Sequence, residues 1–269
     1  MVELRGITVA VGEWYARTLS ITLPRNARHF GEVLVVTSPN DDDVRRVVAS
    51  VPNARVFATD AFTRHGAAFN KGLAMEEGFS ELGRHGVICI HDADILFPAT
   101  LPLERIVPGR LYGMRRRILT DPAKWSDSLD WRLCPMHRDG GPIGFAQVFH
   151  AADIAAVHPW YDVTFAHGGG GDAFFMGHWP REKWCVLPVD VLHLGPPDRH
   201  WFGTSPEAVD TMAAFVVRNG WTRAALQHDR AADARVGEIR ERVEVPGYPP
   251  STFELPFVKR AQQRQKSAP

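Results

Sequence analysis

Apolar runs and longer amphipathic segments alternate along the first hundred residues of the chain. The apolar runs are short and rich in β-branched residues, which is typical of strands covered on both faces, whereas the segments between them carry apolar residues at helical spacing. Strands are predicted at residues 7–11, 33–36, 54–58 and 87–90, and helices at residues 14–30, 41–49 and 67–82. Residues 41–43, three successive aspartates, are expected to supply an N-cap and negative charge to the second helix, and Pro24 is placed to kink or restart the first.

This alternation predicts the fold class. Strand, helix and strand, repeated at this spacing, favour an α/β protein with a central sheet that is mixed but mostly parallel. Ligands of such sheets bind beyond the carboxyl ends of the strands. The residues at those ends are Gly12, Thr37, Asp60, Asp92 and Asp94. The sequence therefore predicts a ligand site at this edge of the sheet.

The second part of the chain has a less regular pattern. Further strands are predicted at residues 110–119, 144–149 and 185–192, and helices at 151–157 and 206–219. Residues 121–141 are rich in Trp, Asp, Pro and Gly and are predicted to form a long surface loop. We expect a single domain over residues 1–245, followed by a Pro-rich and then basic tail over residues 246–269.

Composition narrows the range of partners. The 269 residues carry no formal net charge, so no global electrostatic attraction to nucleic acid or to an anionic membrane is expected. No run of about 18 apolar residues is present to span a bilayer, and the first residues lack the apolar core of a signal peptide. Cys89, Cys134 and Cys185 show neither metal-binding nor disulfide spacing, which suits a reducing compartment. We therefore expect a soluble, cytoplasmic protein; its oligomeric state is not indicated.

Two carboxylates follow the fourth predicted strand at positions i and i+2. In an extended chain this spacing points Asp92 and Asp94 the same way and Ala93 the opposite way. Two carboxylates on one side repel each other unless a cation lies between them, and hard divalent ions prefer oxygen ligands. The pair therefore suggests a metal site, whereas the competing interpretation is that the two residues cap a turn.

Four motifs in this order resemble those of a known enzyme family. They are Phe69-Asn70-Lys71-Gly72, Asp92-Ala93-Asp94, the glycine-rich segment that ends at Asp172, and His193. Over roughly residues 6–203 the chain resembles glycosyltransferases of the GT-A fold, in particular galactosyltransferase-like members. The resemblance implies a Rossmann-like catalytic domain with a donor half over residues 1–97 and an acceptor half over residues 98–245. It also implies a nucleotide-sugar donor, such as a UDP-sugar, and a Mn²⁺ or Mg²⁺ cofactor.

The resemblance further implies a metal site. Asp94 and His193 would hold the ion, and Asp92 would bind it directly, bind it through water, or contact the ribose. The ion would stabilise the negative charge that develops on the diphosphate leaving group. An imidazole ligand favours Mn²⁺ over Mg²⁺. The alternative for His193 is a structural role, and His200 is the competing histidine.

Asp172 is expected to remove the proton of the acceptor hydroxyl, as an acid here does in inverting members of the fold. Gly170 and Gly171 would let the backbone approach the acceptor sugar closely. Gly171-Asp172 stands where the commoner motif has Glu-Asp, which leaves the position of the base and the inverting outcome open, and Asp172 is also a candidate helix N-cap. Trp179 is expected to stack on the acceptor sugar, although a core position is the alternative.

A larger set of residues is expected to bind the donor. These residues lie at strand ends or near the start of a helix, next to the expected base, ribose and diphosphate: Gly12, Glu13, Thr37, Arg64, Asn70, Lys71 and Asp92. The alternative for Arg64 is plain surface charge. Arg115, Arg116 and Arg117 alternate faces of a predicted strand, so at most two share one side, and one of them is a candidate for the donor or an anionic acceptor.

Two other function classes remain. A nucleotidyltransferase shares a related sheet and metal-assisted phosphate chemistry, but it usually carries a Gly-rich basic loop after the first strand, which Gly12-Glu13-Trp14-Tyr15 does not provide. A non-catalytic nucleotide- or sugar-binding module is disfavoured because all the expected polar groups are present. The candidate acceptors are a glycan, a protein, a lipid-linked sugar and a modified base in DNA, such as a hydroxymethylated pyrimidine.

Overall fold

One sheet organises the part of the protein that the computed structural model describes, which is residues 3–137, 141–196, 200, 203 and 242–249. Within these ranges eight strands pair in the order β3-β2-β1-β4-β7-β6-β8-β5. Their bounds are Leu4–Val9 (β1), Glu32–Thr37 (β2), Ala54–Ala58 (β3), Val87–His91 (β4), Ile95–Leu96 (β5), Leu111–Leu119 (β6), Ala146–His150 (β7) and Trp184–Leu194 (β8). The helix predicted at 206–219 and nearly all of the predicted tail lie outside the described residues.

The first half of the sheet is parallel and the second half is mixed. Strands β3, β2, β1 and β4 pair in parallel, whereas β7 is antiparallel to both β4 and β6, and β5 is antiparallel to β8. The remaining pair, β6 with β8, is parallel. The predicted α/β class with a mixed, mostly parallel sheet is therefore confirmed. The sheet runs without interruption from the first half of the chain into the second.

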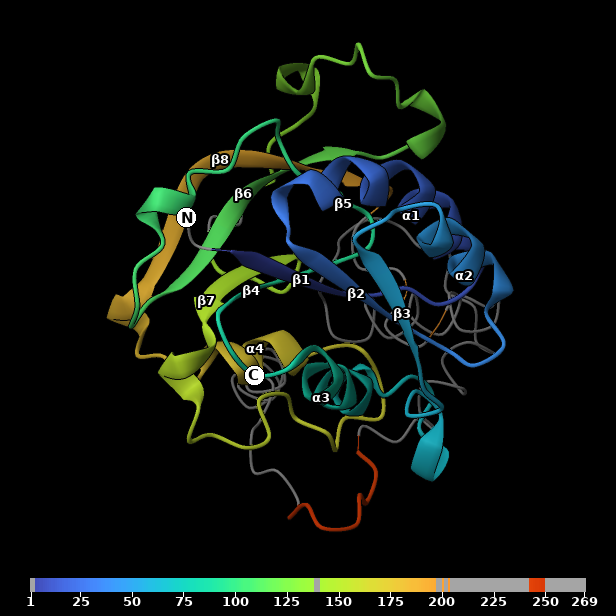
Figure 1. Ribbon diagram of the computed structural model, residues 1–269, viewed down its shortest axis with the longest axis vertical. Helices are drawn as coiled ribbons and strands as arrows, with labels where there is room; N and C mark the ends of the chain where they lie inside the picture. Colours follow the sequence, from blue (N-terminus) through green and yellow to red (C-terminus); the bar gives the residue numbers. More distant parts are fainter. Residues whose placement is uncertain (1–2, 138–140, 197–199, 201–202, 204–241, 250–269) are drawn as a thin grey trace, which may run out of the picture.

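Helices cover both faces of this sheet (Figure 1). Helices α1 (Glu13–Asn26) and α2 (Asp42–Ala49) pack on one face, and α3 (Lys71–Leu82) packs on the other. A fourth, short helix is α4 (Gly171–Met176). No helix among the described residues is long and apolar enough to cross a bilayer.

The position of β4 in the sheet explains the apolar run at residues 87–90. Val87 and Cys89 lie in the core beneath α1 and α2, whereas Ile88 and Ile90 lie in the core against α3. Because successive side chains of a strand point to opposite faces, a strand covered on both sides needs an unbroken apolar run. Residues 87–90 are buried, as predicted, and His91, which extends the strand by one residue, is buried too.

Three predicted helices differ from those observed, and the one expected at 151–157 is only a 3₁₀ turn at Ala151–Ile154. The helix expected at 67–82 begins at Lys71, because the Asn70 side chain accepts a hydrogen bond from the amide of Leu73 and caps it. The helix expected at 14–30 continues through Pro24 and ends at Asn26, after which a 3₁₀ turn follows. The predicted cap of α2 is confirmed, because Asp41 accepts a hydrogen bond from the amide of Val44 at 3.2 Å.

The order of the strands determines where a ligand can enter. The chain moves outward from β1 to β2 and β3, then returns to place β4 on the other side of β1. Such a reversal opens a crevice at the carboxyl ends of the two central strands. Val9, at the end of β1, and Asp92 and Asp94, just after β4, all line a cavity at this point.

Candidate functional site

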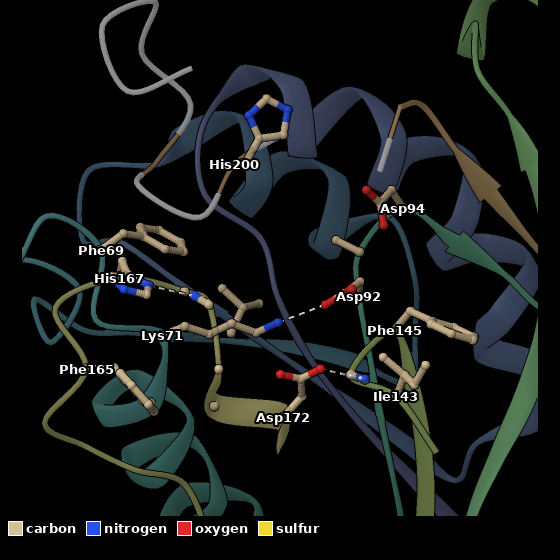
Figure 2. A pocket seen from close by; sticks show the side chains of 18 of the residues that line it. Phe69, Lys71, Asp92, Asp94, Ile143, Phe145, Phe165, His167, Asp172 and His200 are labelled. Carbon is tan, nitrogen blue, oxygen red and sulfur yellow. Dashed lines mark hydrogen bonds and ion pairs between the residues drawn. The ribbon is translucent and has the colours of Figure 1, made fainter. Parts of the chain in front are cut away.

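The cavity at the carboxyl ends of the strands has a volume of about 360 Å³. Its walls come from both halves of the chain. The charged and histidine side chains that line it are Lys71, Asp92, Asp94, Arg116, His167, Asp172, His193 and His200. Figure 2 shows Lys71, Asp92 and Asp172 facing one another, with Asp94 at one end and Phe69, Phe165 and His167 at the other.

Asp94 and His193 form a buried pair in this cavity. Strand β5 aligns Ile95 with His193 of β8, and the amide of Leu194 donates to the carbonyl of Asp94 at 2.8 Å. This pairing brings Nε2 of His193 to 3.2 Å from Oδ2 of Asp94, with side chains only 6% and 9% exposed. Burial alone would raise the pKa of Asp94, but His193, with a further contribution from Lys71, holds that pKa below its usual value.

The donor atoms of this pair suit a divalent ion. Oδ1 of Asp94 and Nδ1 of His193 are buried, and neither has a hydrogen-bond partner in the described part of the chain. Among the described residues no group of three His, Cys, Asp or Glu side chains converges on one point. The protein thus offers two ligands, which is common where phosphate oxygens and water complete the coordination of an ion.

Asp92 has a different partner. Its Oδ1 lies 2.8 Å from Nζ of Lys71, the first residue of α3. Burial would lower the pKa of Lys71, but the carboxylates of Asp92, Asp172 and Asp94 outweigh it and raise that pKa, so the ammonium group is retained. Residues 92–95 form a turn instead of continuing the strand, and in this turn the amide of Ile95 donates a hydrogen bond to the carbonyl of Asp92. Both carboxylates still line the cavity, whereas Ala93 is in the core on the α1 side.

Asp172 is held by the backbone of a different segment. Its Oδ2 accepts a hydrogen bond from the amide of Gly144 at 3.2 Å. The cap of α4 is Gly170, in a left-handed conformation with φ of 85°, so Asp172 is not the N-cap. A Cβ atom at position 144 would lie 2.6 Å from Cβ of Asp172, so glycine is required for this approach. Gly170 and Gly171 also line the cavity.

The residues predicted at the base and ribose do not line the cavity. Thr37 is fully buried, and its hydroxyl lies 3.3 Å from Oδ2 of Asp41. The same carboxylate oxygen accepts from the amide of Gly12 at 2.6 Å. Gly12 and Thr37 are thus tied together by the residue that caps α2, and Glu13 begins α1. Their predicted contacts with the donor stay predictions.

Three further predicted residues lie away from the cavity lining. Arg64 forms ion pairs with Asp60 and Glu77, and Asn70 is fully buried, where it caps α3 and donates to the carbonyl of Val163 at 2.7 Å. Trp179 is 4% exposed and packs in the core. Trp179 is therefore a core residue and does not stack on an acceptor sugar, because a ring enclosed by other aromatic rings has no free face for a sugar.

Several residues of the lining did not come from sequence reasoning. Tyr15, in the first turn of α1, lies at the cavity, where burial and the charges of Asp94 and Asp92 raise its pKa. Phe69 and Phe165 supply aromatic surface at the opposite end. No local signal distinguishes these from core aromatics.

Arg116 also lines the cavity, and the sequence predicted only that one of the three arginines at 115–117 would reach a ligand. Alternation along β6 turns Arg115 and Arg117 to one side, where both pair with Asp190, and leaves Arg116 on the other side at the cavity. The predicted alternation of the three arginines is confirmed. Which side faces the ligand depends on the strands paired with β6.

No protein-family model and no curated protein sequence matches the chain. Solved structures give remote matches. 4-Diphosphocytidyl-2C-methyl-D-erythritol synthase from Anaerococcus prevotii DSM 20548 matches with 13% identity and a TM-score of 0.40 over 80% of this chain and 99% of that chain. Mannosyl-3-phosphoglycerate synthase from Rubrobacter xylanophilus matches with 16% identity and a TM-score of 0.45, over 85% of this chain and 77% of that chain. Inositol-1-phosphate CTP transferase from T. maritima matches with 10% identity and a TM-score of 0.44, over 79% of this chain and 96% of that chain. Matches at these identities and TM-scores carry no information about the reaction.

Proposed function

We propose that this protein is a metal-dependent glycosyltransferase that moves a sugar from a nucleotide-diphosphate sugar, such as a UDP-sugar, to an acceptor hydroxyl. One observation carries the proposal. A single cavity contains a buried carboxylate–imidazole pair suited to a divalent ion and, separately, a carboxylate held by a backbone amide. Phosphate stabilisation and proton removal need these two kinds of group at different positions.

The metal half of the site is assigned to Asp94 and His193. In this proposal the carboxylate of Asp94 and the imidazole of His193 would hold a Mn²⁺ or Mg²⁺ ion, which when bound would supply positive charge to the diphosphate as it leaves. Asp92 stays close enough to contact the ion through water or to bind the ribose, while its Oδ1 pairs with Lys71. Lys71 would exchange this partner for a phosphate oxygen when the donor binds, since an ammonium group pairs with either anion.

The proton-transfer half is assigned to Asp172. An acceptor oxygen forms a bond to the anomeric carbon while the bond from that carbon to the diphosphate oxygen breaks and its electron pair leaves with the nucleotide. Asp172 takes the proton from the acceptor hydroxyl. The hydrogen bond from Gly144 orients the carboxylate. Direct attack with a base on the acceptor side gives inversion at the anomeric carbon.

Calorimetry of UDP binding, with and without Mn²⁺, tests the metal half. We expect the wild-type protein to bind UDP at least about tenfold more tightly with Mn²⁺, because a bridging ion adds direct bonds to the phosphates. Asp94→Ala should lose that gain. Asp127→Ala is the matched control, since Asp127 is an exposed carboxylate, 78% accessible, paired with Arg25. An undiminished effect of Mn²⁺ in Asp94→Ala would overturn the metal assignment.

The products separate this function from its alternatives. A glycosyltransferase incubated with UDP-sugars releases UDP, by transfer to an acceptor or slowly to water. A nucleotidyltransferase incubated with nucleoside triphosphates and a sugar phosphate releases pyrophosphate instead. A binding module releases neither. Release of pyrophosphate, or of no product despite tight nucleotide binding, would overturn the proposed reaction.

A further inference from the structure

The side chain of Arg116 is a buried cation that has no acidic partner among the described residues. It is 8% exposed, and its guanidinium group lies over the ring of Phe145, 4.5 Å from the centroid. Nη2 lies 3.3 Å from Nδ1 of His137. Nε is buried and has no hydrogen-bond partner in the described part of the chain. No carboxylate of the described residues lies within ion-pair distance of Arg116.

Its neighbours on β6 show that this is not a shortage of acidic residues. Arg115 and Arg117 share Asp190, with nitrogen–oxygen distances of 2.8 Å and 2.7 Å. Strand alternation excludes Arg116 from that carboxylate and directs it to the cavity. A buried guanidinium that keeps its charge but lacks an anion is costly, so such a group is typically completed by a ligand.

The position of Arg116 favours the acceptor over the donor. Two neighbouring residues, Gly144 and Phe145, link Arg116 to Asp172. The amide of Gly144 donates to the Asp172 carboxylate, and the ring of Phe145 packs under the guanidinium group of Arg116. The donor diphosphate already has candidate partners in Lys71 and in an ion at Asp94. Arg116 is therefore the cation on the side of the site assigned to the base.

We propose that Arg116 binds a phosphate or carboxylate group of the acceptor, so that the substrate that receives the sugar is an acidic hydroxyl compound. This inference rests on the proposed function, which assigns the acceptor to the Asp172 side. A guanidinium presents a planar set of N–H donors that matches either anionic group. An acidic acceptor must also approach a site containing three carboxylates, and Arg116 offsets that repulsion at the point of contact.

Inorganic phosphate and acetate are the probes for this subsite. Thermal unfolding of the full chain is followed while each anion is titrated into protein saturated with Mg²⁺ and UDP. We expect at least one anion to raise the Tm of the wild-type protein, and Arg116→Gln to weaken its apparent binding at least about tenfold. Arg115→Gln is the matched control: it removes the same charge from the same strand at a side chain that is 51% exposed, and it should leave anion binding unchanged.

Several outcomes would overturn the inference. One is that neither anion stabilises the wild-type protein. Another is that Arg115→Gln reduces the effect as much as Arg116→Gln does. A third is an anion effect that appears without nucleotide but vanishes at saturating UDP, which would assign Arg116 to the donor diphosphate. If UDP itself does not bind, the proposed function fails, whereas the titration without nucleotide still tests Arg116.

Folding of the variant is checked by the same measurement. Without anions, the Tm of Arg116→Gln should equal or exceed that of the wild-type protein, because the substitution removes a buried charge that has no acidic partner among the described residues. A purely structural role for Arg116 predicts a lower Tm instead. Should Arg116→Gln not fold, Arg116→Lys gives the comparison: it keeps the charge but not the planar donors, so anion binding should weaken without being lost.

Discussion

Nε2 of His193 lies 3.2 Å from Oδ2 of Asp94, and this contact joins the turn after β4 to the last residues of β8. The two residues are distant in sequence but are placed together by the short antiparallel pairing of β5 with β8. Both side chains are more than nine-tenths buried. The pair therefore occupies a site where water competes poorly for a cation, which is the physical basis of the first prediction.

Mn²⁺ should raise the thermal stability of the wild-type protein, and both Asp94→Asn and His193→Gln should remove that increase. At an ion concentration about 100-fold above the dissociation constant, binding to the folded state adds about 2.7 kcal/mol, which corresponds to several degrees in Tm. His200→Gln decides between the two histidines. If it abolishes the increase and His193→Gln does not, the ligand is His200.

Asp172→Asn should lower kcat by about 10²- to 10⁴-fold while leaving UDP binding unchanged, because an amide cannot accept the acceptor proton but keeps the shape of the carboxylate. Asp153→Asn is a close control, since Asp153 also accepts a hydrogen bond from a glycine amide, that of Gly109 at 2.8 Å. Steady-state kinetics with the same donor and acceptor measure both variants. Full turnover in Asp172→Asn would remove it as the base.

Gly144→Ala should displace the Asp172 carboxylate. The added Cβ would lie 2.6 Å from Cβ and 2.9 Å from Cγ of Asp172, so one of the two segments must move. We expect a loss of about 1–3 kcal/mol in the free energy of unfolding and a fall of about 10²-fold in kcat.

A control and a double variant sharpen that prediction. Gly141→Ala meets only ordinary contact, with Cγ1 of Ile143 at 3.8 Å, and should leave kcat unchanged. Combining Gly144→Ala with Asp172→Asn should reduce kcat little further than Asp172→Asn alone, since both act through one carboxylate. Additive losses in the double variant would contradict a shared mechanism.

His167 should make the protein less stable in mild acid. Burial, with a further contribution from the charge of Arg242, lowers the pKa of His167 from 6.5 to about 4. Below pH 6.5 His167 is protonated in the unfolded chain, whereas in the folded protein it stays neutral down to about pH 4. The free energy of unfolding therefore falls as the pH drops through this window. The loss at pH 5 is about 2 kcal/mol by linkage.

Urea unfolding at pH 7.5 and pH 5 measures this effect. In His167→Gln the difference in the free energy of unfolding between the two pH values should shrink by about the same 2 kcal/mol. His65→Asn is the control, because His65 is an exposed histidine at a φ of 60°, a conformation that asparagine tolerates. An identical pH dependence in His167→Gln and the wild-type protein would contradict the prediction.

Much of the fold followed from local patterns. The apolar runs predicted β2, β3 and β4 to within a residue or two. For β2 and β4 the reason is that a strand covered on both faces needs apolar residues on both faces. A cap of α2 within residues 41–43 also followed from the sequence, because a cap depends on residues only three positions apart. The start of α3 lies four residues later than predicted, at an equally local cap in which Asn70 accepts from the amide of Leu73.

The candidate site divides in the same way. Chain order alone indicated that Asp92 and Asp94 follow a central strand and that Asp172 follows a glycine-rich segment. Their partners became known from the folded protein: Lys71 for Asp92, His193 for Asp94 and the Gly144 amide for Asp172. The tertiary structure also moved Trp179 into the core and Arg116 to the cavity. The physical reason is that periodicity along one strand reports which residues share a face, whereas the identity of that face depends on the order in which distant strands pair.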